Sequence, residues 1–232
     1  MTGHIHSFKT STSEINQTSK WLTWAKAHQE IVTVTGILIV LISVGIPYYL
    51  HNLEQSEKDA MGALNLGQYY LHSPVDSKNG PFKSNTERDQ QALQAFQRIT
   101  TDYAGTHTAK IARFYVAKCQ FFLGQYNLAY ANFNAANQEL KDTPLGEESN
   151  IGKILCLEVQ NQWDEAIKLY EIFLKENIDS FIIPEIHLRL ANAYLKIQDK
   201  VKAIQQLKLT AEKYSDSDWG KEATRRLEEL KS

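Results

Sequence analysis

In the last two thirds of this chain, four alanines are spaced 37 residues apart. A bulky apolar residue comes four positions after each alanine. The pairs are Ala92 with Phe96, Ala129 with Phe133, Ala166 with Tyr170 and Ala203 with Leu207. A small residue lets two helices approach closely, and the bulky residue one turn later fills the space beside it. The interval therefore predicts an array of stacked helix hairpins.

The stretch 109–136 shows one hairpin clearly. Helical spacing of apolar residues leads to a tight turn at Gly124 and resumes after Tyr126, with Ala129 and Phe133 on the second helix. This stretch resembles the tetratricopeptide repeat, in which a glycine and an aromatic mark the turn between a first helix (A) and a second helix (B). In the later copies the matching residues are Trp163, Ala166, Tyr170 and Phe173, then Leu190, Ala191, Tyr194, Ala203 and Leu207. In the first copy they are Leu66, Gly67, Tyr70, Ala92 and Phe96.

The chain departs from that family pattern in two respects. Its interval is longer than the family's usual period of about 34 residues, so longer connections are expected. Glycine at the turn is kept only at Gly124, and the next two copies have Asn161 and Gln198 there. The resemblance covers roughly residues 57–232.

The expected fold class is all-α. A single transmembrane helix is followed by a right-handed α-solenoid of about four hairpins and a C-terminal capping helix. The repeat domain is expected over 52–232, with copies at about 57–103, 107–141, 146–177 and 184–214 and a cap at 217–231. Ser217 or Asp218 is suited to cap that last helix, and Pro184 suits the first turn of the helix before it.

A second feature is the apolar stretch 31–51. No Asp, Glu, Lys or Arg occurs from Ile31 to Leu53, and about 20 apolar residues span a bilayer core of about 30 Å. Tyrosines and tryptophans flank the stretch where interfacial aromatic side chains are common. A cleaved signal peptide and a buried soluble helix are the alternatives. The late start of the stretch and the bulky residues that follow it favour an uncleaved span.

The segment before the span is polar. Residues 1–30 are expected to be a partly disordered tail, disordered over 1–18, that ends in an interfacial segment around Trp21 and Trp24. Three lysines precede the span, and only Lys58 lies within twenty residues beyond Leu50. This bias favours a single-pass protein of the cytoplasmic membrane with its N-terminus inside and a periplasmic repeat domain.

Two other segments leave alternatives open. Residues 72–89 contain Pro74, Gly80 and Pro81 among polar residues, so an exposed loop is expected in the first hairpin, either as a binding loop or as a tolerated insertion. Cys119 and Cys156 stand 37 residues apart on successive A helices. Buried thiols are favoured over a disulfide there, because helix axes about 8–10 Å apart put the pair near the limit of disulfide geometry.

The sequence carries few signs of chemistry. It has no phosphate-binding loop, no His-Glu-x-x-His, no Cys-x-x-Cys and no Gly-x-Ser-x-Gly. Its net charge is −2 and it has no cluster of basic residues, so it lacks the basic patch that is typical of nucleic-acid-binding proteins. Scattered histidines such as His187 are expected to pack between helices. We therefore expect no enzyme, metal, cofactor, nucleic acid or small-molecule substrate.

Stacked hairpins instead offer a concave surface lined by the A helices. Phe114 and Phe121 are the most suggestive residues there, because large apolar groups on an open groove bind partner segments. The alternative is that they pack within the array. Alignment on the repeat pattern predicts a partner-binding groove lined by Met61, Leu64, Gln68, Ile111, Phe114, Lys118, Phe121, Phe122, Ile151, Leu155, Glu158, Leu188, Asn192 and Lys196.

An early span followed by an extracytoplasmic tetratricopeptide array resembles the ancillary subunit family of the Sec translocon. That resemblance implies association with the protein-export channel, and partners that are proteins or exported polypeptides. The stretch 213–230 also resembles Tol-Pal-associated repeat proteins, so a scaffold in outer-membrane assembly or cell-division coordination is the alternative. Proteins of that second group usually carry a cleaved signal or a lipid-modified cysteine, and this chain has no cysteine near residue 50.

Overall fold

The computed structural model describes residues 12–75 and 80–231, with side chains from Lys20 onward. It divides into two compact units, which meet between Gln55 and Ser56. The disorder predicted for residues 1–11 lies outside the described residues. Residues 12–18, however, are helical, so the disorder predicted for them is wrong. Thr12, Ser13 and Glu14 are residue types that favour the first turn of a helix.

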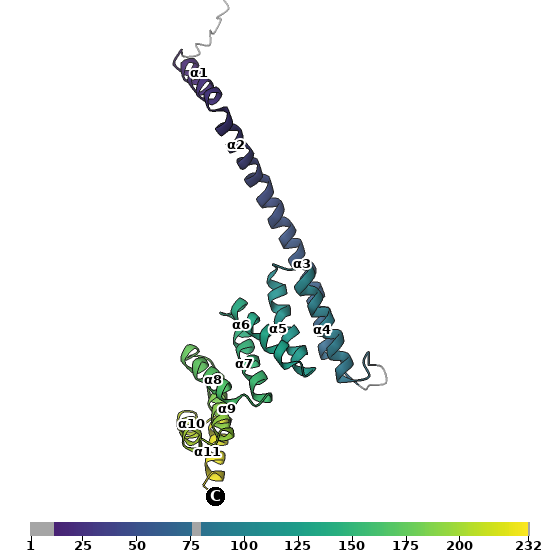
Figure 1. Cartoon of the computed structure of the whole chain (residues 1–232), viewed down its shortest axis with the longest axis vertical. Helices are drawn as coiled ribbons and strands as arrows, with labels where there is room; N and C mark the ends of the chain where they lie inside the picture. The colour runs from purple at the N-terminus through teal and green to yellow at the C-terminus, as the bar shows by residue number, and fades with distance from the viewer. Residues whose placement is uncertain (1–11, 76–79, 232) are drawn as a thin grey trace, which may run out of the picture. The chain divides into compact units, whose positions relative to one another are not determined.

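The first unit consists of consecutive helical segments (Figure 1). They are α1 (Thr12–Ala27), α2 (Gln29–Val40), a π-helical turn (Leu41–Gly45) and the start of α3 (Ile46–His72). Pro47 follows the π-helical turn and has no N–H to continue the regular ladder, which accounts for the local change of pitch. Helix from Gln29 to His72 runs for 44 residues and is long and apolar enough to cross a membrane, with a mean hydropathy of 2.3 in its most apolar window.

The second unit is built of helices in antiparallel succession. After α3 come α4 (Asn85–Asp102), α5 (His107–Phe122), α6 (Tyr126–Glu139), α7 (Pro144–Val159), α8 (Trp163–Glu176), α9 (Ile183–Lys196), α10 (Lys200–Lys213) and α11 (Asp218–Glu229). The helices α3, α5, α7 and α9 are the A helices of successive hairpins, and α4, α6, α8 and α10 are the B helices. The predicted all-α repeat fold, which follows an N-terminal apolar helix, is confirmed.

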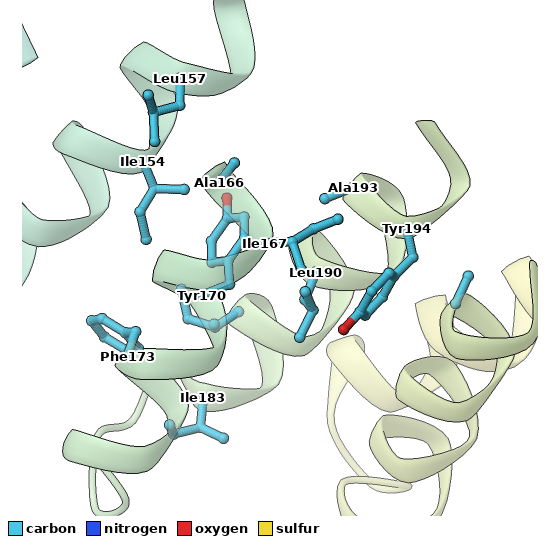
Figure 2. Close-up of a cluster of buried hydrophobic side chains, with 12 residues drawn as sticks. Ile154, Leu157, Ala166, Ile167, Tyr170, Phe173, Ile183, Leu190, Ala193 and Tyr194 are labelled. Carbon is cyan, nitrogen blue, oxygen red and sulfur yellow. The ribbon is translucent and has the colours of Figure 1, made fainter. Parts of the chain in front are cut away.

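The 37-residue interval marks fully buried positions on the B helices. Ala92, Ala129, Ala166 and Ala203 are all 0% exposed, and the bulky residues that follow them are buried as well. Figure 2 shows one of the resulting clusters, in which Tyr170 of α8 lies among side chains of α7 and α9. Each B helix therefore packs on its own A helix and on the next one.

The hairpin turns share one backbone conformation. Gly124, Asn161 and Gln198 stand 37 residues apart and have φ of 74°, 59° and 65°. Left-handed backbone is easy for glycine, tolerable for asparagine and strained for glutamine. The turn geometry thus persists where its preferred residue has been replaced.

The joins between hairpins also repeat. At Thr106, Thr143 and Ser217 the hydroxyl donates to the carbonyl three residues before it. The same hydroxyl accepts from the backbone N–H three residues after it, and so caps the next helix. The cap predicted at Ser217 is confirmed. Ser180 occupies the same place in the interval but donates to Glu147 instead.

A carboxylate on α3 adds a second cap to α5. Glu57 accepts hydrogen bonds from the backbone N–H groups of His107 and Thr108, at 2.7 and 2.9 Å, and from the Thr108 hydroxyl at 2.5 Å. Desolvation acts to raise the pKa of Glu57, but these hydrogen bonds outweigh it, and the pKa lies below its ordinary value. Residues about fifty positions apart are thereby joined at the first inter-repeat contact.

The loop in the first hairpin is less open than expected. Phe82 is buried, and its ring meets Tyr70 of α3 with centroids 5.7 Å apart. The prediction of an exposed loop is wrong at this residue, because an aromatic side chain folds back onto the hairpin. Residues 76–79 of the loop lie outside the described residues.

Three smaller predictions are confirmed. Cys119 and Cys156 are free, buried thiols in different core clusters. His187 packs between helices, with its Nδ1 2.7 Å from Oε1 of Gln206 on α10. Pro184 lies in the first turn of α9.

Candidate functional site

A small apolar hollow lies between the A helices α5 and α7. Its volume is about 200 Å³. Phe121 and Phe122 of α5 line it together with Ile151 and Leu155 of α7, and the ring of Phe133 on α6 contributes to its wall. We call this feature the aromatic hollow. The residues that line it are Phe114, Lys118, Phe121, Phe122, Phe133, Glu148, Ile151, Gly152 and Leu155.

The repeat interval explains why these residues meet. Phe114 and Ile151 are 37 positions apart, as are Lys118 and Leu155. Equivalent positions on consecutive A helices face the same side of the array, so the two sets converge. Gly152 provides the remaining space, because a Cβ there would come within 2.6 Å of the Phe133 ring.

Lysine 118 lies at the rim of the aromatic hollow. Its Nζ is 3.8 Å from Oε1 of Glu148 and 5.7 Å from the centroid of the Phe114 ring. The ammonium group thus links α5 to α7 and also rests against an aromatic face. An apolar side chain bound in the hollow would lie beside this cation.

A larger hollow lies among α7, α9 and α11. Its volume is about 620 Å³, and we call it the charged hollow. Carboxylate and guanidinium groups dominate it, with Trp219 of α11 among the apolar residues. The residues that line it are Glu158, Glu185, Leu188, Arg189, Asn192, Leu195, Trp219, Glu222, Arg225, Arg226, Glu229 and Leu230.

The arginines of the charged hollow are paired along their own helices. On α9, Arg189 lies 2.8 Å from Glu185. On α11, Arg226 lies 2.7 Å from Glu222, and Arg225 pairs with both Glu222 and Glu229. These hydrogen-bonded arginines hold the pKa of Glu222 down at about 2. The charges on α9 and those on α11 are therefore largely balanced within each helix.

Glutamate 158 of α7 has a different environment. Its carboxylate accepts a hydrogen bond of 3.0 Å from the hydroxyl of Tyr170. Within the part of the chain that the structure describes, it makes no ion pair within 4.0 Å. Burial raises the pKa of this carboxyl above its ordinary value, although Tyr170 and the charge of Arg189 favour the ionised form.

The predicted groove residues divide into exposed and buried sets. Met61 and Asn192 are exposed, and Ile111, Lys118, Phe121 and Leu155 are partly buried. Gln68 is also partly buried, and its amide donates to the hydroxyl of Tyr115 on α5. Lys118, Phe121 and Leu155 come together in the aromatic hollow, whereas Leu188 and Asn192 line the charged hollow.

Three of the predicted residues belong to the core. Leu64, Phe114 and Leu188 are 8%, 2% and 4% exposed. The expectation that they present open surface is wrong, because side chains of the helices packed beside them cover these residues. Phe114 contacts Phe133, with ring centroids 6.0 Å apart, and so forms the floor of the aromatic hollow.

The sequence prediction of the groove did not include the part of the charged hollow that α11 contributes. The prediction for this helix was only that it closes the array, and Arg225 and Glu229 were not among the predicted site residues. Trp219 is an additional signal, because a tryptophan on an otherwise polar helix is unusual and here remains 40% exposed.

Comparison with known proteins supports the repeat assignment. The family model described as "Tetratricopeptide repeat" matches residues 185–217, which cover most of α9 and all of α10. No curated protein matches the chain. Two crystal structures of nearly identical TPR-like repeats of a putative kinesin light chain from Podosopora anserina, one of them the Q17M form, are similar in structure. Each is 13% identical and covers 73% of this chain and 84% of its own length, with a TM-score of 0.57.

The fold and its repeated packing therefore define a TPR-like repeat protein. Folds of this class typically serve as scaffolds for protein–protein interaction rather than as catalysts. Within the described residues, no three His, Cys, Asp or Glu side chains are grouped so that they could hold a metal ion.

Proposed function

We propose that this protein is a membrane-anchored scaffold that binds a segment of a partner protein, or of an exported polypeptide, along its A helices. The aromatic hollow between α5 and α7 is the observation that carries the proposal. Four phenylalanines and two aliphatic side chains line a space of about 200 Å³, which suits one bulky side chain of a bound segment. Buried apolar anchors of this kind dominate the energetics of protein interfaces.

Membrane anchoring is the second part of the proposal. The apolar side chains from Ile31 to Leu50 are exposed in the first unit, and a helix that exposes them over this length is stable in hydrocarbon rather than in water. The helix continues into α3, the first A helix. Following the lysine bias, we place the N-terminus in the cytoplasm and the array on the far side of the cytoplasmic membrane.

The proposed role is to assist newly exported chains beside the protein-export translocon. It rests on the resemblance of the layout to the ancillary translocon subunits. A scaffold of the Tol-Pal type is the competing role, and such proteins are usually released from the span or held by lipid. The intact mass of the mature protein separates these roles, since retention of residues 31–51 contradicts a cleaved signal.

Site-specific photocrosslinking tests partner binding. A photoreactive phenylalanine at Phe122, which is 52% exposed and lines the aromatic hollow, should capture a polypeptide in native membranes. The matched control is Leu128, which is 55% exposed on the B helix α6. Equal crosslinking at both positions, or none at Phe122, contradicts the proposed groove. Capture of proteins unrelated to export or envelope assembly contradicts the proposed role.

A further inference from the structure

The aromatic hollow and the charged hollow are neighbours. Leu155 lines the first and Glu158 lines the second, and both belong to α7. Residues three apart on a helix lie on the same face, about 5–6 Å apart. The two hollows therefore share α7, and a segment that extends along α7 from the first hollow reaches Glu158.

The charged hollow has one more carboxylate than guanidinium group. Four glutamates and three arginines line the charged hollow. Arg189, Arg225 and Arg226 each already pair with a glutamate of their own helix. Among the described residues, Glu158 makes no ion pair within 4.0 Å; it accepts a hydrogen bond from Tyr170, and it shares the nearby charge of Arg189 with Glu185. Glu158 is therefore the carboxylate of this hollow that has no close ion pair of its own.

A partly buried carboxylate gains most from a cation that arrives with the ligand. Burial raises the pKa of the Glu158 carboxyl, although Tyr170 and the charge of Arg189 act in the opposite direction. A further cation supplied by the ligand would favour the ionised carboxylate. A second carboxylate brought to the same place would be repelled and would leave two charges desolvated. An acidic segment is therefore disfavoured at this end of the surface.

Spacing along the ligand follows from α7. Ile151 lines the aromatic hollow, and Glu158 lies two turns further along the same helix, about 10 Å at about 1.5 Å per residue. An extended chain advances about 3.3 Å per residue, so a side chain in the aromatic hollow and a side chain at Glu158 are separated by about three residues of extended chain.

We infer that the preferred ligand is an extended polypeptide segment in which a bulky apolar side chain fills the aromatic hollow and a lysine or arginine about three residues away pairs with Glu158. The inference rests on the proposed scaffold function and specifies the chemistry of the segment it binds. The apolar side chain supplies most of the affinity and the basic side chain supplies selectivity.

Fluorescent peptides test this pattern with the full-length chain in lipid nanodiscs. The probe is a twelve-residue Gly/Ser peptide that carries one Phe and one Lys three positions apart, and binding is followed by anisotropy. Companion peptides replace Phe by Ala or Lys by Glu. We expect each replacement to weaken binding about tenfold, the effect of losing a charge-assisted contact or a buried side chain.

The variant Glu158→Gln isolates the role of the charge. It should weaken binding of the Phe/Lys peptide about tenfold and leave the Phe/Glu peptide unchanged or tighter. Glutamine keeps an acceptor for Tyr170, and thermal unfolding monitors whether the fold is intact. Glu165→Gln on the B helix α8 is the control, because it makes the same charge change on an exposed side chain away from both hollows.

The outcomes separate the inference from the proposed function. Equal binding of the Lys and Glu peptides, or equal effects of the two Glu→Gln variants, overturns the inference. If no peptide binds although Phe122 crosslinks a native partner, the inference is again overturned while the scaffold function stands. Loss of crosslinking at Phe122 contradicts the scaffold function itself.

Discussion

Two glycine-to-alanine substitutions should change stability in opposite directions. Gly152 of α7 and Gly62 of α3 both lie inside helices. A Cβ at Gly152 would meet the Phe133 ring at 2.6 Å, whereas a Cβ at Gly62 would have nothing within 4 Å. The intrinsic helix preference is the same at both sites, and it favours alanine by about 0.5–1 kcal/mol. Only the packing differs.

The magnitudes follow from that difference. Gly62→Ala should stabilise the array by about 0.5–1 kcal/mol. Gly152→Ala should add an overpacking cost of about 1–3 kcal/mol, because Phe133 is buried and cannot move aside easily. The expected net effect lies between about zero and a loss of about 2.5 kcal/mol, after the helix preference is subtracted from the overpacking cost, so Gly152→Ala should be less stable than Gly62→Ala by about 1–3 kcal/mol.

Urea unfolding followed by far-ultraviolet circular dichroism measures both free energies of unfolding under one set of conditions. A third variant, Phe133→Leu in the Gly152→Ala background, removes the ring atoms that clash and should recover part of the loss. The reasoning is refuted if Gly152→Ala is as stable as Gly62→Ala, or if Phe133→Leu lowers stability by the same amount in the Gly152→Ala background as in the unsubstituted chain.

Three further predictions concern the turn, the α5 cap and the thiols. Gln198→Gly should raise the free energy of unfolding by up to about 1 kcal/mol, because it relieves the strain of a left-handed backbone at glutamine. The control Gln205→Gly, inside α10, should lower the free energy of unfolding by about 1 kcal/mol. Urea unfolding measures both changes. Because the folded-state pKa of Glu57 is lowered, its contribution is present above the ordinary carboxyl pKa and is lost as pH falls through the folded value. Glu57→Gln should abolish this dependence, and no difference between the pH–stability curves of the two chains would contradict the proposed cap. Burial raises the pKa of Cys119 and Cys156 to about 12, so maleimide labelling followed by mass spectrometry should modify neither thiol in the folded protein and both in urea.

The candidate site was predictable in part. The 37-residue interval brings Lys118, Phe121 and Leu155 onto one surface, and the structure places them together in the aromatic hollow. The interval could not show that Phe114 lies beneath that surface. Burial depends on which helix packs against a side chain, and here the Phe133 ring of α6 contacts Phe114.

Contacts between residues distant in sequence were beyond prediction. The bonds of Glu57 to the first turn of α5 join segments about fifty residues apart. The buried position of Phe82 depends on a ring contact with Tyr70 across the inserted loop. Neither contact recurs at the 37-residue interval, so no pattern in the sequence predicts it.

The sequence by itself determined the hairpins, their register and the apolar helix before them, because spacing along a helix and recurrence along the chain are properties of the sequence. Only the tertiary structure decided which apolar residues remain accessible, and which carboxylate, Glu158, lacks an ion pair among the described residues. The physical reason is that exposure and electrostatic compensation depend on the neighbours that fill the space around a side chain. Those neighbours come from other helices.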